Sequence, residues 1–86
     1  MNRDKLYMLH QMIKSQNTGT PKEAADKLGV SRATFFRYKT ALEDLGAEVV
    51  WAHCWSTYIY GNHFEISHPN YEMRVSVEGK EFITRI

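Results

Sequence analysis

The most informative segment of this 86-residue chain is TPKEAADKLGVSRATFFRYKTALEDLG, residues 20–46. It opens with the signals of a helix start. Thr20 with Glu23 three positions later makes a capping box, and Pro21 suits the first helical position. Gly29 then supplies the left-handed conformation that ends a helix. These residues predict a helix from Pro21 up to the residue before Gly29.

A second helix should follow at once, capped by Ser31 and running over Arg32–Leu45 until Gly46 stops it. Small Ala25 lets the two helices cross closely, with the glycine turn between them. The positions that should bury apolar side chains in this pair are Ala24, Leu28, Val30, Phe35 and Tyr38. Two helices with a glycine turn form either a helical hairpin or a helix-turn-helix. The spacing favours the helix-turn-helix.

Outward from this stretch, the periodicity changes from helical to strand-like. A first helix over residues 4–15 has an apolar face of Leu6, Leu9, Met12 and Ile13. After Gly46 the chain is rich in β-branched and aromatic residues, and the expected strands cover residues 48–52, 57–60, 64–66, 72–77 and 81–86. The fold class is therefore α+β, with three N-terminal helices followed by a β-hairpin and a short C-terminal β segment.

Composition and charge narrow the class of protein. No apolar run approaches the length of a membrane span or a signal-peptide core, and the single cysteine, Cys54, fits a reducing cytoplasm. The net charge is only +1, but residues 1–40 hold eight lysines and arginines against three acids, whereas residues 41–86 hold three against seven. A polyanion should be drawn to the N-terminal half.

Residues 20–49 resemble the helix-turn-helix of DeoR-type and related winged-helix regulators, with Leu28-Gly29-Val30-Ser31 as the turn. The following VVWAHCWSTYIYGNHFEI, residues 49–66, takes the place of their β-hairpin wing. The resemblance implies a winged-helix DNA-binding domain over residues 1–66. Residues 67–86 then form a C-terminal β-hairpin extension, which is the expected place for self-association as a homodimer.

The resemblance also implies that the helix Arg32–Leu45 enters the major groove of double-stranded DNA. Residues expected to contact DNA are Lys22, Ser31, Arg32, Ala33, Thr34, Phe36, Arg37, Tyr38 and Thr40, with His53 and Trp55 from the wing. Arginine can pair bidentately with guanine, which favours Arg32 and Arg37 as readers. Tyr38 should be partly core and partly turned to phosphate.

Three features depart from the family pattern. Ala33 and Phe36 stand where relatives often carry polar or basic residues, although either suits a thymine methyl. Lys39 takes a position that is commonly apolar, where its stem can snorkel. The wing tip has no lysine or arginine, so the wing should contribute little charge to phosphate binding.

The expected function is sequence-specific DNA binding by a small bacterial or phage-type transcriptional regulator, without a sensor domain. One alternative is a DNA-bending accessory factor in recombination. Another is a winged helix that binds proteins, favoured by the uncharged wing and by Trp55. Solvated surface charge on an ordinary helical domain is the plainest alternative for the basic residues.

Catalysis, cofactors and small-molecule ligands are not expected. His53, Cys54, His63 and His68 lie near one another in sequence but lack the paired spacing of zinc ligands, so we interpret them as surface residues rather than a metal site. No segment matches a phosphate-binding glycine loop. Trp51, Tyr58 and Tyr60 should cover the core.

Overall fold

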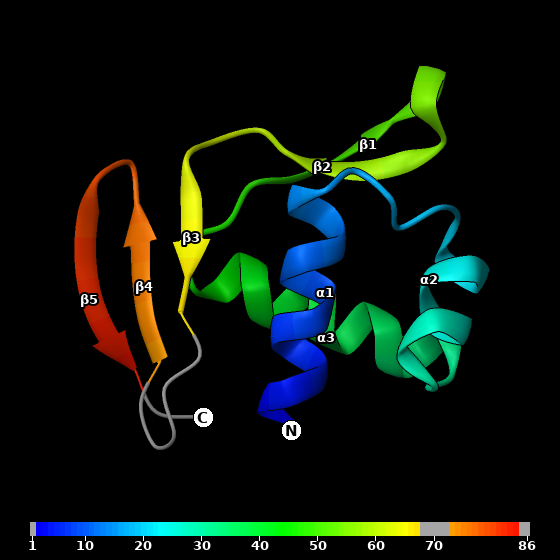
Figure 1. Ribbon diagram of the computed structural model, residues 1–86, viewed down its shortest axis with the longest axis horizontal. Helices are drawn as coiled ribbons and strands as arrows, with labels where there is room; N and C mark the ends of the chain where they lie inside the picture. Colours follow the sequence, from blue (N-terminus) through cyan, green and yellow to red (C-terminus); the bar gives the residue numbers. More distant parts are fainter. Residues whose placement is uncertain (1, 68–72, 85–86) are drawn as a thin grey trace.

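The computed structural model describes residues 2–67 and 73–84, and these form an α+β fold (Figure 1). Helices come first along the chain and strands second, as the sequence predicted. The elements are α1 (Arg3–Lys14), α2 (Pro21–Leu28), α3 (Arg32–Asp44), β1 (Val49–Ala52), the short 3₁₀ turn η1 (His53–Trp55), β2 (Thr57–Tyr60), β3 (Phe64–Ile66), β4 (Met73–Val77) and β5 (Lys80–Thr84). The helix ends differ from the predicted ends by at most one residue.

The predicted start and end signals of α2 are confirmed. Thr20 Oγ1 accepts a hydrogen bond from the Glu23 N–H at 3.3 Å, and Glu23 Oε1 accepts one from the Thr20 N–H at 3.1 Å. Pro21 occupies the first turn, and Gly29 ends the helix with φ +70°. Ser31 then caps α3. Local chemistry alone therefore accounts for the tight turn between α2 and α3.

The strands form two separate antiparallel sheets. One is the β1–β2 hairpin, in which Val49 lies opposite Tyr60. The other has the order β3-β4-β5, with Ile66 opposite Val75. Sheet pairing between β3 and β4 therefore crosses the boundary that the sequence suggested between residues 66 and 67, and that division into domains stays a prediction.

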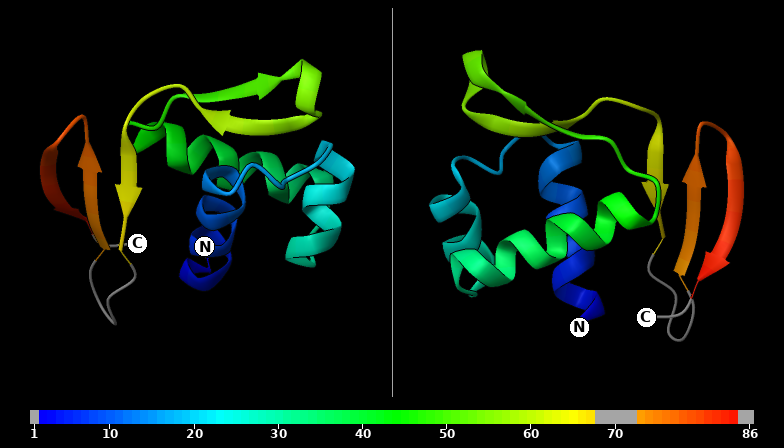
Figure 2. Two further views of the ribbon diagram at one scale, coloured as in Figure 1. Left: turned by 45° about the horizontal axis from the view of Figure 1, so that its top comes forward. Right: turned by 180° about the vertical axis from the view of Figure 1, so that it is seen from behind.

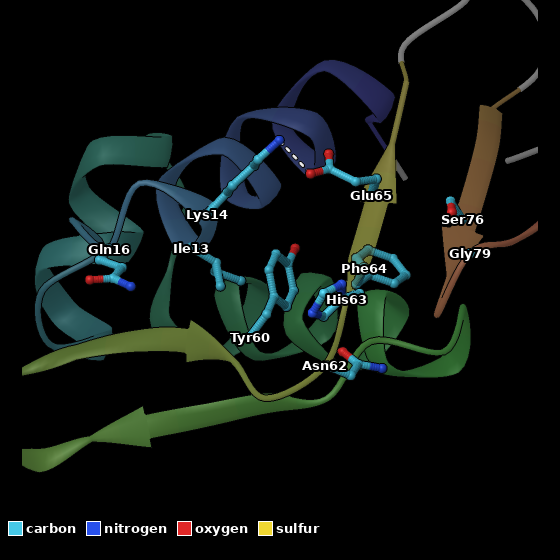
Figure 3. A pocket seen from close by; sticks show the side chains of 10 residues that line it. All are labelled: Ile13, Lys14, Gln16, Tyr60, Asn62, His63, Phe64, Glu65, Ser76 and Gly79. Carbon is cyan, nitrogen blue, oxygen red and sulfur yellow. Dashed lines mark ion pairs between the residues drawn. The ribbon is translucent and has the colours of Figure 1, made fainter.

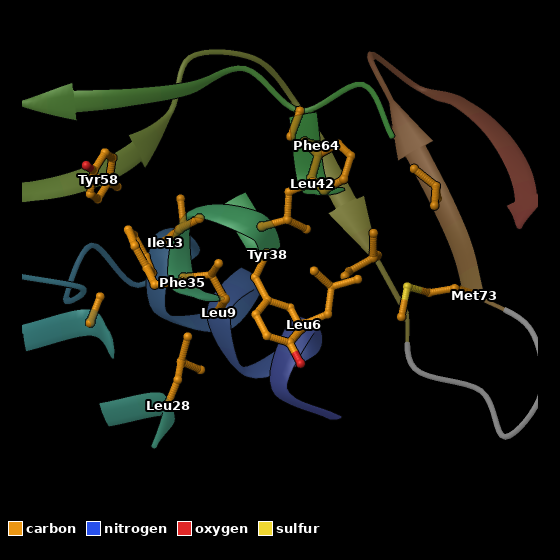
Figure 4. Packing of buried hydrophobic residues seen from close by; sticks show 14 of the residues in the cluster. Leu6, Leu9, Ile13, Leu28, Phe35, Tyr38, Leu42, Tyr58, Phe64 and Met73 are labelled. Carbon is orange, nitrogen blue, oxygen red and sulfur yellow. The ribbon is translucent and has the colours of Figure 1, made fainter. Parts of the chain in front are cut away.

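One hydrophobic cluster joins the helices to both sheets (Figure 4). Its largest fully buried apolar members are Leu6, Leu9, Ile13, Phe35, Leu42, Met73 and Val75. The last two come from β4, so the C-terminal segment completes the core on which the helices rest. Burial of such side chains contributes about 1.5–3 kcal/mol each.

Gly46 follows Leu45, the C-cap of α3. Both its backbone conformation and the closeness of Val77 require a glycine at this position. Its φ is +110°, and a Cβ built there would lie 2.8 Å from Val77 Cγ2. A side chain at this position would push β4 away from the end of α3.

Candidate nucleic-acid interface

One face of α3 is turned to solvent. Figure 2, in its view from behind, shows the helix crossing the near side of the molecule, with α2 at its N-terminal end and the β1–β2 hairpin alongside. Ala33, Phe36, Arg37 and Thr40 are exposed and repeat at helical spacing. Together with Ala41 and Asp44 they line a shallow depression along the helix. Four of the predicted contact residues thus share one surface.

The first turn of α3 presents polar groups at the end of this surface. The Ser31 hydroxyl accepts a hydrogen bond from the Thr34 N–H at 3.1 Å and donates one to Thr34 Oγ1 at 3.0 Å. Ser31 and Arg32 are exposed, and Thr34 is half-buried. Because a helix leaves its first N–H groups without intrahelical partners, those of Arg32 and Ala33 are available to an anion.

Many basic side chains of the N-terminal half are already engaged. The Lys5 ammonium donates to the Gly29 carbonyl at 3.4 Å, and the Lys27 ammonium donates to the Asn17 carbonyl at 2.5 Å. Two more lysines make ion pairs, Lys14 with Glu65 and Lys39 with Glu43. By contrast, Lys22, Arg32 and Arg37 are exposed and make no ion pair within the described residues. Within the described N-terminal half, these three positive charges therefore lie on α2 and α3.

Tyr38 lies in the core rather than on this surface. It is 6% exposed, and its hydroxyl accepts a hydrogen bond from the Asn2 N–H at 3.1 Å. The predicted core role is confirmed, but almost no surface is left for contact with phosphate. Tyr38 instead ties the start of α1 to α3.

The β1–β2 hairpin is anchored along β2, and its tip is exposed. The Tyr58 ring packs on Phe35 of α3, with centroids 5.7 Å apart, and the Lys39 ammonium lies 5.9 Å from the Tyr58 centroid. At the tip, η1 leaves His53 exposed and the Trp55 side chain 75% exposed. The tip thus offers an aromatic surface without cationic groups.

Two buried threonines fasten this hairpin, and nothing in the sequence signalled them. Thr57 Oγ1 accepts from the Thr18 N–H, and Thr18 Oγ1 accepts from the Tyr58 N–H, each at 2.9 Å. The two hydroxyls are also 2.9 Å apart. Thr18 lies in the loop between α1 and α2, so the pair joins that loop to the hairpin and fixes the hairpin's position beside α3.

Among the described residues, His10 is a further buried polar residue that the sequence did not reveal, since it falls on the apolar face of α1. Its side chain is fully buried, and Nδ1 lies 2.8 Å from the Tyr60 hydroxyl. Nε2 lies 3.6 Å from a carboxylate oxygen of Glu65, just outside hydrogen-bonding range. Burial lowers the pKa of His10 to about 4, despite the opposing effect of Glu65. The imidazole is therefore neutral at pH 7.

A pocket of about 410 Å³ opens beside Tyr60 and Glu65, between the end of α1 and β3 (Figure 3). The ion pair between Lys14 and Glu65 lies on its wall, so the nearest charges balance. In the described part of the chain, no group of three His, Cys, Asp or Glu side chains gathers as metal ligands. His68, which the sequence analysis considered as a zinc ligand, lies outside the described residues.

Comparison with protein-family models, curated proteins and solved structures finds no match to this chain. The likeness to DeoR-type regulators therefore rests on the chain's own residues and on the order of its elements. Over residues 2–67 and 73–84, no helix has the length and apolarity needed to cross a membrane.

Proposed function

We propose that this chain is a winged-helix protein that binds double-stranded DNA with α3 in the major groove and acts as a small transcriptional regulator. The observation that carries the proposal is the exposed surface of α3. It combines helical spacing, unpaired arginines and a capped first turn, with a hairpin held beside it. The major groove of B-DNA is about 12 Å wide and admits an α-helix.

Base reading is assigned to this surface and to its N-terminal end. Arg37 and Arg32 are the hydrogen-bonding readers, because a guanidinium matches the two acceptors of a guanine edge. Ala33 and Phe36 flank Arg37 and offer apolar contact to thymine methyl groups. Because the surface combines arginines with apolar side chains, we expect the target half-site to contain both guanine and thymine.

Phosphate contacts are assigned to the rim. Lys22 projects from α2, and the first turn of α3 offers free N–H groups beside Ser31 and Thr34. Thr40 suits a phosphate farther along the helix. His53 and Trp55 at the hairpin tip suit the sugar face of the backbone rather than its charge. Exposed, unpaired Cys54 fits a reducing compartment such as the cytoplasm.

Selection of bound duplexes from a random pool, followed by binding titrations, tests the proposal. An enriched sequence should bind more tightly than random duplex at moderate salt. Arg37→Ala should weaken binding to that sequence by about 1–3 kcal/mol and random duplex by less. Lys22→Gln should weaken both equally and reduce the salt dependence by about one counterion.

Lys14→Gln is the matched control, because it removes a positive charge from α1, away from the proposed surface. It should leave specific binding within about twofold of wild type, since a half-exposed ion pair contributes little. Failure to enrich any sequence, or equal competition by random duplex at moderate salt, overturns sequence-specific binding.

Trp55 supports one alternative, a winged helix that binds another protein. A ring that is 75% exposed at a tip without cations resembles the aromatic anchors of protein interfaces. In that case Trp55→Ala abolishes capture of the partner, and Arg37→Ala does not. If instead Arg37→Ala causes the loss of binding and Trp55→Ala does not, the result supports DNA binding.

A further inference from the structure

The outer strand of the β3-β4-β5 sheet has an open edge. β5 pairs with β4 from Lys80 opposite Val77 to Thr84 opposite Met73. Within the described residues, no strand pairs with its other side (Figure 1). An open edge presents backbone donors and acceptors that another strand can use.

The backbone groups at this edge belong to two residues. Glu78 and Gly79, with φ +52° and +82°, form a two-residue turn, so the flanking pair Val77 and Lys80 is hydrogen-bonded. Hydrogen-bonded and non-hydrogen-bonded pairs alternate in an antiparallel ladder. The N–H and C=O groups of Glu81 and Ile83 therefore point outward, whereas those of Phe82 point to β4.

Apolar side chains accompany these groups. Phe82 is 43% exposed and Ile83 is 58% exposed. Phe82 lies opposite Val75, which lies opposite Ile66, so the three make one cross-strand row on the face of the sheet that meets the core. Ile66 and Val75 are buried in this row. Phe82 ends the row at the open edge, where its side chain is partly exposed.

We propose that two copies of this chain associate by pairing β5 with β5, antiparallel about a two-fold axis, to form one continuous sheet. In this arrangement Glu81 and Ile83 of one copy exchange hydrogen bonds with Ile83 and Glu81 of the other. Phe82 then faces Phe82 in the central pair, which is a non-hydrogen-bonded pair with Cα atoms about 4.5 Å apart. The apolar row becomes continuous from one core to the other.

The charges are compatible with this register and with a second copy as the occupant. Glu81 faces Ile83 and Lys80 faces Thr84, so no like charges lie directly opposite. Arg74 lies opposite Ile83 within one copy, which places Glu81 of the second copy next in the same row. A shift of two residues toward the turn would oppose Glu81 to Glu81, and a shift either way breaks the contact between the phenylalanines.

Sedimentation velocity of the full chain tests the proposal without DNA, so its outcome is independent of the proposed function. Between about 5 and 500 µM, wild type should pass from monomer to dimer, the range expected of a small interface. Phe82→Arg should raise the dissociation constant at least about tenfold, because it opposes two like charges. Ile83→Gln changes the neighbouring residue without placing a like charge opposite Glu81 or Arg74, so it should retain the dimer.

A charge-swap mixture tests the register itself. Phe82→Arg and Phe82→Glu should each be monomeric, and their equimolar mixture should recover the dimer. Far-UV circular dichroism and the melting temperature of each variant establish that it folds; a half-exposed position tolerates both changes. Monomeric wild type over the whole range, or a mixture that stays monomeric, overturns the proposal. Amide exchange in wild type that slows with concentration at Glu81 and Ile83 supports it further.

Discussion

Acidification should destabilise this protein through His10 before most carboxylates are protonated. Burial lowers the pKa of His10 from 6.5 to about 4 in the folded chain, whereas the unfolded chain keeps the ordinary value. Between these values the unfolded state binds more protons, so the stability contributed by neutral His10 is present above pH 6.5 and falls as the pH drops toward 4. The full difference corresponds to about 3 kcal/mol. About 2 kcal/mol of it should be lost by pH 5.

Urea unfolding followed by circular dichroism at pH 7, 6 and 5 measures this loss. His10→Gln removes the titrating group, so its free energy of unfolding should change by about 2 kcal/mol less than wild type between pH 7 and 5. His63→Gln replaces an exposed histidine and is the matched control for the change of an imidazole to an amide. Comparing variants cancels the acid-induced changes that the carboxylates cause in all of them.

NMR titration of the imidazole resonances gives an independent readout, which does not depend on how well His10→Gln folds. The His10 resonances should titrate near pH 4. A midpoint near 6.5, together with equal losses of stability in wild type and His10→Gln, would contradict the lowered pKa of His10 and its contribution to stability. It would mean that His10 keeps water contact despite its burial and its hydrogen bond to Tyr60.

Three further substitutions probe the fold by chemical denaturation, with circular dichroism as the signal. Gly46→Ala should cost about 2–3 kcal/mol, because it adds strain at φ +110° and a Cβ 2.8 Å from Val77; no loss would mean that β4 yields easily. Thr18→Val should cost about 1–3 kcal/mol, because the Tyr58 N–H loses its buried acceptor; a neutral result would indicate that water replaces the hydroxyl. Thr20→Ala should cost about 1 kcal/mol through the lost cap of α2, and Thr20→Ser should restore most of it.

Much of the helical half could be predicted from sequence, because its signals act over three or four residues. The capping box at Thr20, the left-handed turn at Gly29 and the cap at Ser31 satisfy backbone groups of the same segment, so they work wherever the segment lies. The buried positions Phe35 and Tyr38 of α3 followed from helical spacing, whereas the residues on its exposed face were expected from the resemblance to DeoR-type regulators. The strands were also placed correctly, because β-branched and aromatic residues gather in short runs after Gly46.

The contacts between those elements depend on the tertiary structure and could not be predicted from local sequence. The hydrogen bond between Thr18 and Thr57 joins residues far apart in the chain, and no local pattern distinguishes these threonines from exposed ones. His10 falls on an apolar helical face, but its pKa depends on β2 and β3 covering it. Tyr38 left the expected contact surface because the start of α1 packs against α3 there.

Signals local in the chain therefore specify the order of the elements and the caps that bound the helices, because each depends on near neighbours in the sequence. Packing of the whole chain places β3 beside β4 rather than beside the hairpin, lets β4 complete the core and, among residues 2–67 and 73–84, leaves one edge of β5 without a paired strand. These outcomes depend on which surfaces remain to be buried once the helices have packed, and no short stretch of sequence contains that information.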